Sequence, residues 1–380
     1  MPSEVIIFQS VLVIFSALIF MLFLIQALIR KMRIENFIGA LFFGLCASSL
    51  GLMNELGLFA DHYLAMSFQL SFYAFEFVGF FLFLERMVTI HGNPVRLTIV
   101  LFFLILDVIS VWLIYIFKGR SEVTNILWLF ADIGYNGLGI YVYLVRGGWL
   151  YWKAYRYTKE KKSLLVYIAF MLLGIGFILV SIADWFDFHP PQPIWAADID
   201  TLSGVFQALG LIVLTVTFAV NINYIYRLPF DIHILMVVYK SGNTIFVQRL
   251  KTKRRLEELE PHLVSGFLSA LNSLFGTIFE KRTYIQKIEG KNTKILFETG
   301  RYATAIIIAE RVSYHLERSL DRYLKDFEDK FHQLLNKREP NMRKFEVGAQ
   351  KLLRSHFPFL MPENSSFLRD ESGTNLSHQQ

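Results

Sequence analysis

The chain has 380 residues, of which 54% are hydrophobic and only 18% are charged, and its formal net charge is +6. An average globular protein has about 25% charged residues, and a disordered chain needs low hydrophobicity with high charge. This composition therefore excludes a disordered chain and argues strongly against a fully soluble protein. The only cysteine, Cys46, excludes an intramolecular disulfide and a thiolate metal site.

The first 227 residues contain several apolar runs of 20 or more residues, which is the length that crosses a bilayer core. The opening residues, Met1-Pro-Ser-Glu, have no positive charge, and no small-residue cleavage site follows the first run. We therefore expect a retained helix there and not a signal peptide. The pattern predicts seven membrane-spanning helices, at 5–29, 36–60, 64–85, 97–117, 125–146, 163–187 and 201–226.

The Lys and Arg residues between these helices are distributed unequally. The segments after the first, third and fifth helices hold eleven of them, and the opposite side holds only Lys118 and Arg120. Because cytoplasmic loops carry the excess of Lys and Arg, we expect the N-terminus outside the cell membrane and the C-terminal third in the cytoplasm. The basic loop after the fifth helix is predicted to contain Arg146, Lys153, Arg156, Lys159, Lys161 and Lys162.

Polar residues inside the predicted spans are the candidates for a ligand site. A central Asp costs about 2.5–3.5 kcal/mol on insertion scales, so such residues are functional candidates by default. Two acids lie near the middle of the third and fourth helices, and others lie in the outer halves of the second, fifth, sixth and seventh. The candidate ligand-binding residues are Glu55, Glu76, Asp107, Trp128, Asp132, Asn136, Asp184 and Gln207.

No Lys or Arg is predicted inside the spans to neutralise the charge of these acids. Three interpretations of the acids therefore remain open. They can be neutral, hydrogen-bonded contacts between helices. They can line an extracellular pocket for a small cationic or polar ligand, or form a proton or ion pathway. His62 and His189 have no HxxxH or HExxH spacing, so the sequence predicts no metal site and no cofactor.

The sequence changes character at Arg227-Leu-Pro-Phe-Asp, after which short apolar runs alternate with Gly turns and charges. Five strands are predicted at 232–240, 244–250, 283–289, 293–299 and 302–310. A helix starting at Pro261 is expected between the second and third strands, and a long helix capped by Ser313 follows the fifth. This order predicts an α+β domain with a five-stranded antiparallel sheet covered by helices.

Residues 341–356 predict one more helix, which is basic and amphipathic and carries Phe345, Ala349, Leu352 and Leu353 on one side. This helix either completes the preceding domain or lies on the anionic inner leaflet. The residues from 361 onward have the composition of a disordered tail. The predicted organisation is a seven-helix membrane domain at 1–228, the α+β domain at 229–338, the basic helix at 339–360 and the tail at 361–380.

Two sequence features of the second domain suggest a family. The order of elements, Lys240-Ser-Gly-Asn after the first strand and the helix Val264-Ser-Gly-Phe-Leu-Ser-Ala-Leu-Asn-Ser-Leu resemble the longin and roadblock group, which has a profilin-like topology. Archaeal members of the longin and roadblock group are especially similar to this domain. The resemblance covers 231–335, and longin is the closer label because the domain opens with a strand. It implies a platform that binds small GTPases or other longin or roadblock domains, a homodimer formed through the cytoplasmic domain, and no catalysis.

The membrane half resembles, in topology only, the seven-helix sensor modules at the N-terminus of prokaryotic signalling proteins. No phosphate-binding loop, kinase-type His box or Gly-rich nucleotide loop occurs in the second half, so we do not expect an enzyme. Our hypothesis is a non-enzymatic membrane receptor or sensor whose cytoplasmic longin-like domain recruits a small GTPase or a similar partner. A membrane anchor or trafficking scaffold for that domain is the first alternative, and a transporter is the second. The lipid bilayer is an expected partner, and nucleic acid is not.

Overall fold

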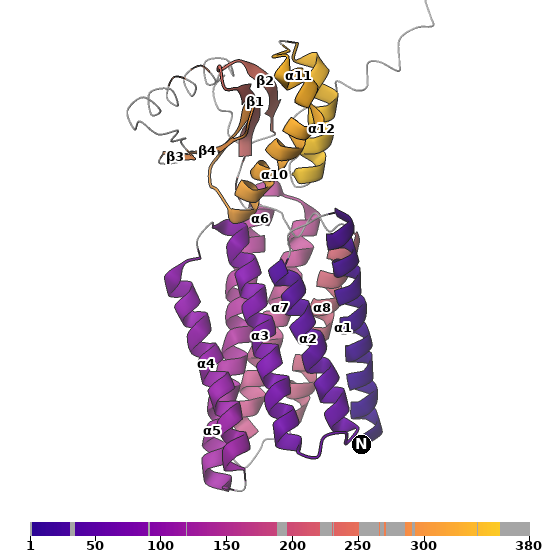
Figure 1. Ribbon diagram of the computed structural model, residues 1–380. Helices are drawn as coiled ribbons and strands as arrows, with labels where there is room; N and C mark the ends of the chain where they lie inside the picture. The colour runs from indigo at the N-terminus through magenta and orange to yellow at the C-terminus, as the bar shows by residue number, and fades with distance from the viewer. Residues whose placement is uncertain are drawn as a thin grey trace, which may run out of the picture. The chain divides into compact units, whose positions relative to one another are not determined.

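The structure is a computed structural model that describes residues 2–30, 35–89, 92–118, 120–187, 196–220, 230, 232–250, 266, 270, 286–290, 293–339 and 341–357. The chain divides into two compact units, Met1–Pro229 and Phe230–Gln380. Figure 1 shows the helices of the first unit and the mixed helix and strand structure of the second. Each unit is described by itself.

The first unit is a bundle of helices in which neighbours in the sequence pack against each other (Figure 1). The first helix also contacts the last, α1 against α8, and α3 packs against both α4 and α5. The π-helix η1 continues α5 and leads directly into α6. The elements are α1 (Pro2–Arg30), α2 (Glu35–Glu55), α3 (His62–Val88), α4 (Pro94–Phe117), α5 (Ser121–Gly139), η1 (Ile140–Gly148), α6 (Trp149–Thr158), α7 (Lys161–Asp187) and α8 (Ala196–Val220).

Among the residues that the structure describes, five helical segments are long and apolar enough to cross a membrane: Glu35–Glu55, His62–Val88, Pro94–Phe117, Lys161–Phe186 and Thr201–Val220. A multi-pass helical membrane domain is thereby supported. The other two predicted spans fall on α1, whose apolar segment Gln9–Ile25 is shorter, and on α5 with η1. A total of seven spans stays a prediction, as do the sides on which the termini lie.

The ends of these helices follow ordinary capping chemistry. Asp61 caps α3, since its carboxylate accepts hydrogen bonds from the backbone N–H groups of Tyr63 and Leu64. Asn93 does the same for α4, and Pro94 occupies the first turn, where its missing N–H costs nothing. At the end of α6, Lys159 adopts a left-handed conformation with φ of 56°. These caps explain why α3 and α4 begin and α6 ends at these positions.

The structure corrects the predicted basic loop between the fifth and sixth spans. The helix does not end at Arg146 but continues through η1 and α6, because Leu150, Tyr151 and Ala154 are buried in the bundle. Only Lys159, of the six predicted loop residues, lies between helices. Arg146 lies in η1, and the others lie on α6 (Lys153, Arg156) or at the start of α7 (Lys161, Lys162).

The second unit confirms the predicted five-stranded antiparallel sheet. The strands are β1 (Ile232–Tyr239), β2 (Thr244–Arg249), β3 (Lys287–Glu289), β4 (Lys294–Thr299) and β5 (Ala303–Ala309), in the order β2-β1-β5-β4-β3. Each neighbouring pair is antiparallel. Gly242, with φ of 91°, makes the tight turn between β1 and β2 that an L-residue would adopt only with strain. All eight residues of β1 and all seven of β5 are buried, so these two neighbouring strands form the core of the sheet.

Three helices follow the sheet: α10 (Tyr314–Lys330), α11 (His332–Asn336) and α12 (Arg343–His356). The predicted cap is confirmed, because Ser313 Oγ accepts a hydrogen bond from the backbone N–H of Leu316 at 3.3 Å. Helix α10 packs on β4 and β5, and α12 packs on α10 and β2. Apart from Gly266 and Ala270, which are helical, the predicted helix after Pro261 lies outside the described residues, as does the predicted tail.

Candidate functional site

The site begins at a close approach between α4 and α5. A β-carbon at Gly134 on α5 would lie 2.5 Å from the backbone nitrogen of Asp107 on α4, so only glycine permits this contact. Asp132 and Asn136 flank Gly134 at two residues on either side. The contact fixes the close spacing of α4 and α5 at Asp107, and Asp132 lies within electrostatic reach of this acid.

Asp107 is a fully buried acid of α4, with 0% of its surface exposed. Within the described part of the chain, neither of its carboxyl oxygens has a hydrogen-bond partner. Asp132 lies within electrostatic reach of it. Because a buried carboxylate without hydrogen bonds is costly and the charge of Asp132 adds repulsion, Asp107 is stabilised by a proton or by a hydrogen-bond donor.

Asn136 connects this pair to the neighbouring helix α7. Its Nδ2 donates a hydrogen bond to Oδ2 of Asp184 at 2.8 Å. Asn136 is only 4% exposed, and its Oδ1 is buried without a hydrogen-bond partner among the described residues. We refer to Asp107, Asp132, Asn136 and Asp184 as the acid centre. Its uncommitted atoms are oxygens, so it is suited to accept hydrogen bonds from a cationic or polar group.

Tyr135 joins the acid centre to the polar residues of α3. It lies within electrostatic reach of Tyr73, Glu76, Asp107 and Asp184. Its ring is 6.3 Å from the ring of Tyr73, whose hydroxyl lies 3.3 Å from Ser48 Oγ. The rings of Phe77 and Phe177 pack on Tyr135 at 5.3 and 5.8 Å. The predicted residue Glu76 thus belongs to the surroundings of the acid centre.

Glu76 also depends on a glycine of a neighbouring helix. A β-carbon at Gly44 on α2 would lie 2.6 Å from Oε2 of Glu76. The carboxyl group of Glu76 therefore occupies the space next to the backbone of α2. Like Asp107, it lies opposite a glycine of the neighbouring helix, although here the contact is made by the end of a flexible side chain.

Three predicted residues are not brought into the acid centre. The side chain of Glu55 is exposed at the last residue of α2. Trp128 packs on the apolar cluster of Val111, Ile114 and Ala131, which accounts for its position on the same face as Asp132. Gln207 packs against α7, where a β-carbon at Gly176 would lie 2.5 Å from its Cγ. No group of three His, Cys, Asp or Glu side chains among the described residues is arranged to hold a metal ion.

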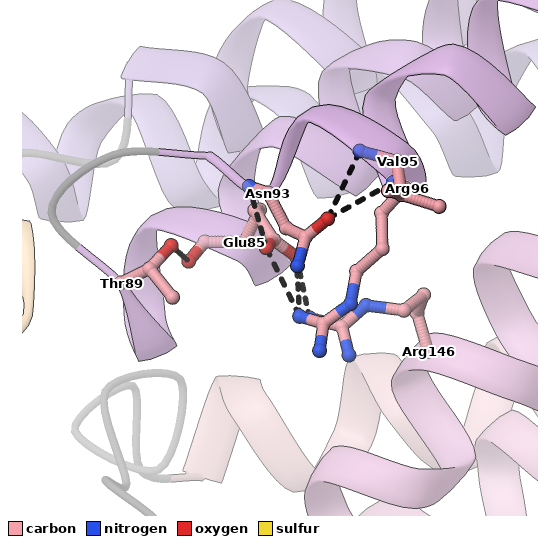
Figure 2. Close-up of polar contacts among 6 residues, drawn as sticks. All are labelled: Glu85, Thr89, Asn93, Val95, Arg96 and Arg146. Atoms are coloured by element: carbon pink, nitrogen blue, oxygen red, sulfur yellow. Dashed lines mark hydrogen bonds and ion pairs between the residues drawn. The ribbon is translucent and has the colours of Figure 1, made fainter.

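A second polar cluster joins the ends of α3 and α4 to η1 (Figure 2). Oε2 of Glu85 accepts a hydrogen bond from Nη2 of Arg146 at 2.5 Å, and Oε1 accepts one from Nη1 of Arg96 at 3.1 Å. The backbone N–H of Asn93 also donates to Oε1 of Glu85, at 3.3 Å. We refer to Glu85, Asn93, Arg96 and Arg146 as the ionic centre.

Sequence reasoning missed the ionic centre because Arg146 was assigned to a loop. The side chains of Glu85 and Arg146 are 3% and 6% exposed, so this is a buried ion pair. In the sequence, the local sign that the helix continues is Gly147-Gly148. In the structure, a β-carbon at Gly147 would lie 2.3 Å from the ring of Phe170, so the glycine permits close helix packing. Two small residues followed by aromatic residues are typical of a packed helix. An arginine buried in such a helix needs an acidic partner. π-Helices are frequent at functional sites, and η1 carries this arginine.

Comparisons with family models, with curated proteins and with solved structures found no match to this chain. Its function is therefore inferred from the residues and their geometry.

Proposed function

We propose that this protein is a non-enzymatic membrane receptor or sensor that binds a small cationic or polar ligand at the acid centre, on the extracellular side. Its C-terminal longin-like domain would recruit a small GTPase or a similar partner in the cytoplasm. The observation that carries the proposal is Asp107, a fully buried acid with two unbonded oxygens beside Asp132. A positively charged ligand would supply the missing hydrogen-bond donors and offset the repulsion between the carboxylates.

The ring contacts around Tyr135 support a cationic ligand. Tyr73, Phe77 and Phe177 surround this tyrosine, so the acid centre has aromatic neighbours as well as carboxylates. Ammonium groups are recognised by carboxylates together with aromatic faces.

One continuous helix supports a link from ligand binding to the cytoplasmic side. The segment from Ser121 to Thr158 runs through α5, η1 and α6 without a break, with Asp132 and Asn136 in its first part and Arg146 further on. A ligand that shifts α5 at Asp132 would act on the Glu85–Arg146 ion pair through the same helix. The ionic centre would then be the element that responds to binding.

The ligand experiment uses the full chain in lipid nanodiscs and measures its unfolding temperature with a panel of small molecules. The panel contains a primary amine, a quaternary ammonium, a guanidinium compound, sodium ions and a neutral polyol. We expect at least one organic cation to stabilise the native chain and the control Glu55→Gln, but not Asp107→Asn. Glu55→Gln removes one acidic charge outside the acid centre. Equal responses of the native chain and Asp107→Asn to every compound would contradict the proposal.

The cytoplasmic part of the proposal rests on the five-stranded sheet with its following helices, which supports the longin resemblance. Its test is the binding of purified small GTPases from the same cell to the full chain, with GDP and with a non-hydrolysable GTP analogue. The mass of the full chain in solution, measured on the same sample, tests the expected homodimer. A chain that binds a cation but no GTPase in either nucleotide state would favour the anchor or scaffold alternative for the second unit.

A further inference from the structure

Helix α12 uses its apolar side to complete the second unit. Phe345, Ala349 and Leu353 are buried, with exposed fractions of 0%, 0% and 2%. The ring of Phe345 stacks on Phe327 at 6.0 Å and contacts the edge of Phe331 at 5.1 Å. The apolar side is therefore committed to the core, and α12 cannot insert it into a bilayer as an interfacial amphipathic helix does.

The opposite side of α12 is basic. Four basic residues are exposed there, together with Val347, whose exposed fraction is 78%. With 3.6 residues per turn, these five side chains fall within roughly 100° of the helix circumference, opposite the buried stripe. We refer to them as the basic face, which consists of Arg343, Lys344, Val347, Lys351 and Arg354.

The charges of the basic face are largely unneutralised. Lys344 forms an ion pair with Glu339 at 2.7 Å. Among the residues that the structure describes, Arg343, Lys351 and Arg354 form no ion pair. Three free cationic side chains on one side of a folded helix are not needed for the core. They are therefore available to an anionic surface.

We propose that the basic face binds anionic lipid headgroups of the same membrane that holds the first unit. Charge complementarity selects this occupant, because clusters of Lys and Arg are attracted to anionic leaflets. The length of the connection supports it: the candidate span Thr201–Val220 ends ten positions before Phe230, the first residue of the second unit. Ten residues reach at most about 35 Å, so this connection keeps the second unit at a high effective concentration near the bilayer.

Val347 adds a specific expectation to this proposal. It is the most exposed apolar residue of α12 and lies between the basic side chains. On an anionic membrane it would be covered by headgroups, so position 347 reports contact directly. An exposed position outside the basic face would stay accessible, and Asp329 on α10 provides one.

The experiment uses the full chain with Cys46→Ala and one reporter cysteine, either Val347→Cys or Asp329→Cys. Each protein is reconstituted in nanodiscs of phosphatidylcholine alone or of phosphatidylcholine mixed with phosphatidylserine, and its reaction rate with a water-soluble maleimide is measured. We expect a several-fold slower reaction at position 347 in the anionic nanodiscs, restored by high salt because salt screens the attraction. Position 329 should react at the same rate in both.

A charge variant completes the design. Arg343→Gln, Lys351→Gln and Arg354→Gln together remove only exposed charges, so the variant should fold and lose the lipid-dependent protection of position 347. Equal rates at position 347 in both nanodiscs would overturn the proposal. Protection that appears in phosphatidylcholine alone and resists salt would also overturn it, since a protein surface and not anionic lipid would then cover the helix. The salt dependence tests the proposal without any charge variant.

Discussion

The carboxylate of Glu85 on α3 and the guanidinium of Arg146 on η1 form an ion pair at 2.5 Å in which both side chains are almost completely buried. Arg96, at 33% exposed, reaches the other oxygen of Glu85 from α4. Three helical elements thus meet at one carboxylate. Because a buried charge without its partner is costly, this pair fixes the position of η1 against α3.

A double-mutant cycle on this ion pair should show strong coupling. Glu85→Gln alone leaves the buried Arg146 without its partner and should lower the free energy of unfolding by about 3–5 kcal/mol. Glu85→Gln with Arg146→Gln should cost clearly less than the sum of the single changes. The measurement is the unfolding transition of the full chain in detergent.

The neighbouring Arg86 provides the control for this cycle. It is exposed on the same helix, and its Nη1 donates a hydrogen bond to Oδ1 of Asn36 at 3.4 Å. Arg86→Gln should change stability by at most about 1 kcal/mol. Additive effects of Glu85→Gln and Arg146→Gln would show that the pair is not coupled in the membrane.

The contact between Gly134 and Asp107 should tolerate no side chain. Gly134→Ala places a β-carbon 2.5 Å from backbone atoms of α4, which cannot move away as a flexible side chain does. We expect a loss of about 1–3 kcal/mol, the usual cost of overpacking. Gly204 on α8 has no heavy atom within 4 Å of such a carbon, so Gly204→Ala should be neutral or stabilising by up to about 1 kcal/mol. Thermal unfolding of both variants compares the two sites.

The sheet of the second unit was predictable because its signals are local. Apolar runs separated by Gly242, Gly290 and Gly300 placed the strands within a few residues of their observed bounds. The Ser313 cap and the amphipathic stripe of α12 are also local patterns. Whether α12 belongs to the core or to a membrane surface was not predictable, since it depends on Phe327 and Phe331 in another helix.

The acid centre could be predicted only as a set of candidate residues. Their cost in a membrane marks Asp107, Asp132 and Asp184 from sequence alone. Which of them meet depends on the crossing of α4 and α5 at Gly134, and no local pattern encodes that crossing. The ionic centre could not be predicted from the sequence for a related reason. An arginine at the end of an apolar run resembles a loop residue until its distant partner Glu85 is known.

Glu328 should be important for the turn between β4 and β5. Its carboxylate accepts hydrogen bonds from the backbone N–H groups of Arg301, Tyr302 and Ala303, at 2.7–2.9 Å. Hydrogen bonds to a charged group contribute about 1.5–3 kcal/mol, so Glu328→Ala should destabilise the second unit by about that amount. The exposed Asp329 is the control, and Asp329→Ala should have little effect. Hydrogen exchange at the three amides would show whether the turn itself has loosened.

The ion pair between Asp61 and Lys118 should make stability depend on pH in the acid range. The hydrogen bond from Lys118 lowers the pKa of the Asp61 carboxyl group below its ordinary value. Its contribution is therefore present above the ordinary Asp pKa of about 3.9 and is lost as the pH falls through the lowered value. The native chain should be slightly more stable than Lys118→Gln at neutral pH, and this difference should disappear in acid. A difference that is constant with pH would exclude the pair as its cause.

The proposed function requires the ligand site outside and the second unit in the cytoplasm, so it depends on the orientation of the helices in the membrane. Asp61, between α2 and α3, and His62, the first residue of α3, should lie outside, whereas Tyr157 near the end of α6 should lie in the cytoplasm. The reason is the unequal distribution of Lys and Arg between the two sides. In a Cys46→Ala background, His62→Cys should react with a membrane-impermeant maleimide in intact cells, and Tyr157→Cys should react only after permeabilisation. Both positions should react in detergent, which controls for access. Reaction of intact cells at position 157 but not at 62 would place the second unit outside, where it could not meet a cytoplasmic GTPase.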